Sequence, residues 1–95
     1  MKEIERIEIL PHPNDPDGFV AFFSFDKRKN HKEKEEVDEI RKMVMADLLE
    51  RKYLPKPTEV EWRDSGYYFL IVVKEARPEL LEDLKQALNR VLKGR

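Results

Sequence analysis

The chain repeats one order of elements: a strand, a second strand and an amphipathic helix, over residues 4–54 and again over residues 58–93. In each half, apolar residues first recur at every second position and then at every third or fourth, which are the periods of strands and helices. With 95 residues the chain suits a single domain, built from two ββα halves at about 1–54 and 55–95. The repeat therefore predicts an α+β domain with the order ββαββα.

The two strands of each pair differ in charge. Residues 4–10 and 58–63 carry charged side chains on one face, whereas residues 19–25 and 67–73 are apolar on both faces. Doubly apolar strands suit the centre of a sheet, and charged strands suit its edges, where they discourage edge-to-edge association. With strands numbered along the chain, we expect a four-stranded sheet of order 1-2-4-3, antiparallel throughout, with both helices on one face.

Two details of the strands carry predictions of their own. Ile4 is out of phase with the alternation that follows, which indicates a bulge or a fray near Glu5. The segment Asp64-Ser65-Gly66 reads as a tight turn in which Gly66 takes a positive φ.

The first helix is expected to begin after Asn30, with Glu33 three residues further on as in a capping box. Acid-before-base pairs at i, i+4 are predicted for Asp38 with Lys42 and for Asp47 with Arg51. The apolar positions form a main stripe of Val37, Ile40, Met43, Val44 and Leu48, and a second stripe of Met45, Leu49 and Tyr53. Two stripes predict contacts with both the sheet and the other helix.

The second helix is expected to open with Pro78 in its first turn, where a missing N–H costs nothing. Its apolar stripe is Leu80, Leu84, Ala87, Leu88 and Val91.

Composition narrows the function classes. Charged residues make up 41% of the chain, but 19 basic and 20 acidic side chains nearly cancel, so no overall field attracts nucleic acid or an anionic membrane. Cysteine is absent, which excludes disulfides and thiol chemistry. The first residues lack the apolar run of a signal peptide, and no segment approaches the roughly 20 apolar residues that span a bilayer. We expect a soluble protein, cytoplasmic or recombinantly expressed, neither secreted nor bound to a membrane.

No motif in the chain predicts catalysis. The segment 14–18 contains two carboxylates and a glycine, but it lacks the ligand spacing of a calcium loop and reads as turn chemistry. His12 and His31 have no partner at metal-binding spacing, and Ser24 and Ser65 lie outside any nucleophile elbow. We therefore expect no catalytic residue, no metal and no cofactor.

The most basic stretch of the chain, residues 27–34, leads into the first helix. An anion could bind there, because the free N–H groups of a helix N-terminus also face outward; its contacts would be Lys27, Arg28, Lys29 and Lys32. Acidic residues follow directly, so a solvated connector is the favoured interpretation.

The outer face of the sheet gives the most specific functional prediction. If both helices cover one face, the side chains left on the other are mostly apolar: Val20, Phe22, Tyr68, Leu70 and Val72. Such a patch, of roughly several hundred Å², usually binds something, and we expect a homodimer or another protein partner. Two alternatives stay open: the second helix crosses over and buries this face, or Phe22 and Tyr68 stack nucleic-acid bases while the basic stretch holds phosphates.

Residues 77–95 resemble the helices of computationally designed α/β proteins, with a proline start, a leucine stripe, glutamate and lysine faces and a glycine stop. The lack of cysteine and the Glu/Lys-rich first helix are similar. This resemblance implies a scaffold without evolved activity and without functional residues to carry over. The proline-crowded first loop and the run Met43-Val44-Met45 depart from an idealised design. A charged protein from a thermophile would share the composition, so a small natural interaction module is the alternative.

Overall fold

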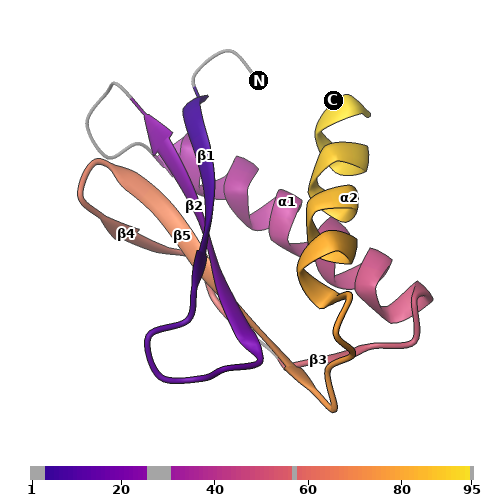
Figure 1. Ribbon diagram of the computed structural model, residues 1–95. Coiled ribbons are helices and arrows are strands. Elements are labelled where there is room, and N and C mark those ends of the chain that lie inside the picture. Colours follow the sequence, from indigo (N-terminus) through magenta and orange to yellow (C-terminus); the bar gives the residue numbers. More distant parts are fainter. Residues whose placement is uncertain (1–3, 26–30, 57, 95) are drawn as a thin grey trace.

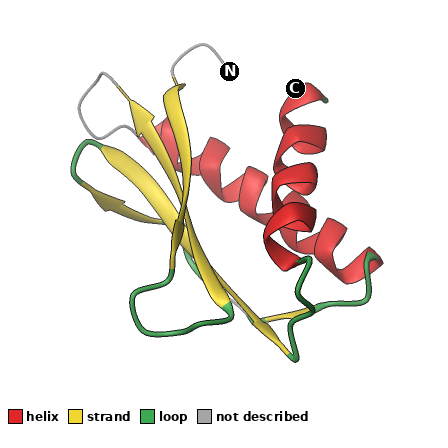
Figure 2. Ribbon diagram, viewed as in Figure 1, coloured by secondary structure: helices red, strands yellow, loops and turns green. Residues whose placement is uncertain are grey.

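The computed structural model describes residues 4–25, 31–56 and 58–94. Figure 1 labels the elements along the chain, and Figure 2 shows the same view by type of secondary structure. In chain order they are β1 (Ile4–Pro11), β2 (Gly18–Phe25), α1 (His31–Glu50), β3 (Leu54–Pro55), β4 (Glu61–Arg63), β5 (Gly66–Lys74) and α2 (Leu80–Lys93).

The sheet is antiparallel, with β2 and β5 at its centre, as the doubly apolar strands predicted. On the far side of β5 the expected single edge strand is divided into two short ones. β4 pairs with the first residues of β5, and β3 pairs with Val73 and Lys74 near its end. The predicted order 1-2-4-3 was therefore incomplete, and the strand expected over residues 58–63 pairs only over Glu61–Arg63.

Both helices lie on the same side of the sheet, and the opposite side carries no helix (Figures 1 and 2). The alternative in which α2 crosses to the outer face was wrong. Between the sheet and the helices lies one hydrophobic core, to which both halves of the repeat contribute. Its fully buried members include Ala21, Phe23, Phe69, Ile71, Val37, Ile40, Val44, Leu48, Leu84 and Ala87.

The helix stripes were predicted well for α2 and less well for α1. All five residues of the α2 stripe are buried. However, α2 begins at Leu80, so Pro78 precedes the helix and the expectation that it lies in the first turn was wrong. In α1, Met43 is 42% exposed and Leu49 is 54% exposed. The prediction that both contact the sheet or the other helix was therefore wrong. The predicted cap Asn30 lies outside the described residues.

The turn between β4 and β5 differs from the prediction in an informative way. Positive φ angles occur at Asp64 (51°) and Ser65 (66°), whereas Gly66 has none. Two successive positive φ angles are those of a type I′ hairpin turn. Gly66 is needed for space instead, because a Cβ atom there would lie 2.5 Å from Cζ of Phe22 and 2.6 Å from the carbonyl oxygen of Phe23.

The predicted irregularity near Glu5 is confirmed. The register between β1 and β2 shifts between Ile4 and Arg6, as expected of a bulge.

Candidate interaction surface

The five residues predicted for the outer face lie together on the two central strands. Val20 pairs with Leu70, Phe22 pairs with Tyr68, and Val72 pairs with Gly18, which has no side chain. All five are partly exposed, whereas the residues between them point into the core and are buried. The outer face is therefore an apolar strip along β2 and β5 that the helices leave uncovered (Figure 1).

A hollow of about 600 Å³ lies on this face. Its apolar lining comes from Leu10, Val20, Phe22 and Leu70, with the ring of Tyr68 beside them. Residues 11–14 of the β1–β2 connection line it next to Leu10, and Arg63 and Asp64 line it at the β4–β5 turn. The volume is within the usual range of binding pockets, roughly 300–1,000 Å³.

Charged side chains border the apolar strip in two rows that run across the sheet. Pairing in register places Arg6, Ser24, Gly66 and Arg63 in one row, and Glu8, Phe22, Tyr68 and Glu61 in the next. Each row thus has small or aromatic residues in its middle and one type of charge at both edges. We call them the arginine row and the glutamate row.

Contacts within the chain link these residues. An Arg6 guanidinium nitrogen lies 2.7 Å from Oε1 of Glu8. The Tyr68 hydroxyl donates a hydrogen bond of 2.7 Å to Oε2 of Glu61. That bond, with some burial, raises the pKa of Tyr68, because it stabilises the neutral phenol.

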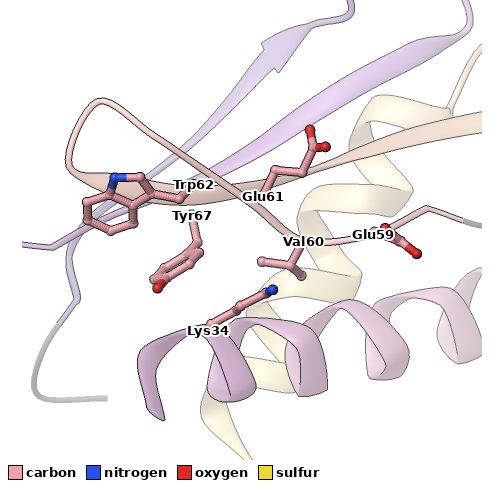
Figure 3. A pocket seen from close by; sticks show the side chains of 6 residues that line it. All are labelled: Lys34, Glu59, Val60, Glu61, Trp62 and Tyr67. Carbon is pink, nitrogen blue, oxygen red and sulfur yellow. The ribbon is translucent and has the colours of Figure 1, made fainter. Parts of the chain in front are cut away.

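In Figure 3, neighbouring side chains at the start of β4 point in opposite directions. Val60 points towards Lys34 on α1, while Glu61 points away from that helix. Trp62 packs edge-on against Tyr67, with 4.8 Å between ring centroids. The hollow of about 330 Å³ beside these residues is lined by Lys34 and by the acidic residues Glu59 and Glu61.

A polar network that the sequence pattern did not reveal joins the two helices. Asp47, which is only 7% exposed, accepts hydrogen bonds of 2.9 Å from both Arg51 and Arg90. Arg51 also reaches Asp83 on α2 at 3.3 Å. The pKa of Arg51 is raised, chiefly by the bond to Asp47, which stabilises the charged guanidinium.

The network continues from Asp83 to Tyr53, which lies in the connection between α1 and β3. The Tyr53 hydroxyl donates a hydrogen bond of 2.7 Å to Asp83, and the Arg77 guanidinium lies 3.9 Å from the centroid of the Tyr53 ring. Burial and the bond to Asp83 raise the pKa of Tyr53. Every charge in this network has an opposite charge or a donor beside it, as expected of a polar network that stabilises the packing of two helices. Only its i, i+4 member, Asp47 with Arg51, was predicted.

The remaining candidates from the sequence fall into two groups. Lys27, Arg28 and Lys29 lie outside the described residues, and Lys32 is an exposed residue in the first turn of α1. The histidines and the loop carboxylates make local contacts, as in the Asp17 amide donating to Asp15 Oδ1 at 2.9 Å. Within residues 4–25, 31–56 and 58–94, no group of three or more His, Cys, Asp or Glu side chains is placed to hold a metal ion.

Comparison of the chain with family models, curated proteins and solved structures finds no match in any of the three. None of the helices in the described part of the chain is long and apolar enough to cross a membrane.

Proposed function

We propose that the protein is a non-catalytic interaction module that forms a homodimer through the outer face of its sheet. The supporting observation is that the central strands have an apolar face that no helix covers. β2 and β5 are apolar on both faces, but the helices cover only the inner face (Figure 2). Binding of a partner to this uncovered apolar strip is favourable, because it removes apolar surface from water.

A protein partner fits this face better than a nucleic acid. Phe22 and Tyr68 lie side by side across two strands, an arrangement on which bases could stack. However, Glu8 and Glu61 flank that aromatic pair at the two edges of the same row. These carboxylates offset the positive charge of Arg6 and Arg63 in the neighbouring row, so the face has no net attraction for a phosphate backbone, and the nearly balanced charge of the chain adds none.

A second copy is the simplest partner, because a twofold dimer needs only one self-complementary surface. A stable interface removes roughly 800 Å² from each partner, which requires more than the five apolar residues. The two charged rows and the residues that line the hollow extend the face to both edges of the sheet. The resemblance of the helices to designed proteins remains a prediction and is compatible with such a dimer.

Sedimentation equilibrium tests this proposal. We expect the wild-type protein to have twice the mass of one chain at about 100 μM, and Leu70→Asp to be monomeric, because it places a charge in the apolar strip. Leu49→Asp is the matched control, since Leu49 is 54% exposed on α1 and its replacement leaves the dimer intact. A wild-type mass of one chain up to about 1 mM overturns the proposal.

The same samples test the nucleic-acid alternative. We expect no shift of single-stranded RNA or DNA at about 50 mM salt. A salt-sensitive shift that Phe22→Ala abolishes would replace the proposed function with base stacking on this face.

A further inference from the structure

The charges on the outer face are arranged so that the face is complementary to itself in one orientation. The arginine row has Arg6 on β1 and Arg63 on β4, and the glutamate row has Glu8 and Glu61 on the same two strands. The rows are two residues apart, which corresponds to roughly 7 Å along a strand.

Two twofold arrangements of face against face set the charged rows of one copy directly on charged rows of the other. With the axis along the strands, each row meets itself, so Arg6 faces Arg63 of the second copy and Glu8 faces Glu61. With the axis across the strands, midway between the rows, Arg6 faces Glu8 of the second copy and Arg63 faces Glu61. Like charges in apposition disfavour the first arrangement, and opposite charges favour the second.

Shape favours the same arrangement. In the middle of the arginine row are Ser24 and Gly66, and in the middle of the glutamate row are Phe22 and Tyr68. The axis across the strands places the small pair of one copy against the aromatic pair of the other. Packed sheets lie about 10 Å apart, a gap that interdigitating side chains of these sizes fill.

The β1–β2 connection supports this orientation too. It lines the hollow at its Leu10 end, so this end is already bordered by residues 11–14. With the axis along the strands, the connections of both copies would meet at the same end. With the axis across the strands they lie at opposite ends of the dimer.

Resting on the proposed homodimer, we infer that two copies pack outer face on outer face about a twofold axis across the strands, with the arginine row of each on the glutamate row of the other. The contacts within the chain do not oppose this pairing. Arg6 is 69% exposed, so its bond to Glu8 contributes little, and a carboxylate accepts more than one hydrogen bond.

The test is a row-swapped variant, Arg6→Glu/Arg63→Glu/Glu8→Arg/Glu61→Arg, mixed with isotope-labelled wild type and followed by native mass spectrometry. The swapped protein regenerates the opposite-charge contacts with itself, so we expect it to dimerise like wild type. Against wild type it presents glutamate to glutamate and arginine to arginine. We therefore expect mixed dimers to fall from the statistical half to less than about a tenth.

The control is Lys85→Glu/Lys93→Glu, which reverses two exposed charges on α2. It is expected to form mixed dimers with wild type at about the statistical half, which shows that subunits exchange. Circular dichroism confirms that each variant is folded.

The outcomes separate the inference from the proposed function. Statistical mixing by the swapped variant means that the charged rows do not set the orientation, and an excess of mixed dimers means that the axis runs along the strands. Either result overturns the inference while wild type remains dimeric. A monomeric wild type overturns the proposed function itself.

Discussion

The two faces of the central strands are alike in composition and opposite in environment. Phe22 and Phe23 are neighbours on β2, yet Phe23 is 0% exposed and stacks on Phe69 at 5.7 Å, while Phe22 is partly exposed and lies over Gly66. The same contrast holds along β5, where Ile71 is buried and Leu70 lines the outer hollow. Hydrophobicity alone therefore does not determine which face becomes the core. The helices determine it, because they cover the inner face and leave the outer face uncovered.

The largest expected difference between the two faces is in the free energy of unfolding lost when one phenylalanine on each face is truncated. Phe23→Ala is expected to lower the free energy of unfolding by about 3–5 kcal/mol, because it leaves a cavity in the core. Phe22→Ala removes the same atoms from a partly exposed site and is expected to cost about 1 kcal/mol. Urea denaturation at low protein concentration, where the monomer dominates, measures both values. Equal losses would mean that the outer face is covered within the monomer.

The residues on each face of β2, β5 and α2 could be predicted, because they depend only on the spacing of apolar residues within each element. Alternation along residues 19–25 and 67–73 gives the two faces of β2 and β5, and the stripe of α2 gives its buried side. The outer strip of Val20, Phe22, Tyr68, Leu70 and Val72 followed from the same alternation once both helices were placed on one face.

The features that were missed depend on residues far apart in the chain. The short strand β3 was not predicted, and in it Pro55 pairs with Val73 of β5. Gly66 was assigned a positive φ, but the ring of Phe22, from another strand, requires its lack of a side chain. The contact of Arg90 with Asp47 joins residues on different helices, and no sequence period encodes it.

Two tyrosines provide a smaller test of the same contrast. The hydroxyls of Tyr53 and Tyr68 each donate a bond of 2.7 Å to a carboxylate, Asp83 or Glu61. Tyr53 is 2% exposed on the helix side, whereas Tyr68 is partly exposed on the outer face. Tyr53→Phe is expected to cost about 1–2 kcal/mol of unfolding free energy, and Tyr68→Phe less than about 0.5 kcal/mol.

The stabilisation by Tyr53 should depend on pH with a definite sign. Its pKa in the folded protein is raised, chiefly by burial and then by the bond to Asp83, above the ordinary value of 10.0. Its contribution is therefore full below about pH 10 and is lost as the pH rises through the folded pKa. Urea denaturation from pH 7 to pH 11 should show the difference between wild type and Tyr53→Phe shrinking above about pH 10. A difference that stays constant across this range contradicts the role of the hydroxyl.

The smallest expected effect concerns the turn between β4 and β5. Ser65 has a φ of 66°, which costs an L-residue energy that glycine avoids. Ser65→Gly is expected to raise the free energy of unfolding by about 0.5 kcal/mol, since the gain is partly offset by the greater freedom of glycine in the unfolded chain. Ser24→Gly makes the same change in the extended strand β2 and is expected to lower it by about 0.5–1 kcal/mol. Opposite signs for two identical substitutions, measured by urea denaturation of the monomer, would show that backbone conformation sets the effect; equal signs would mean that the turn is not strained at Ser65.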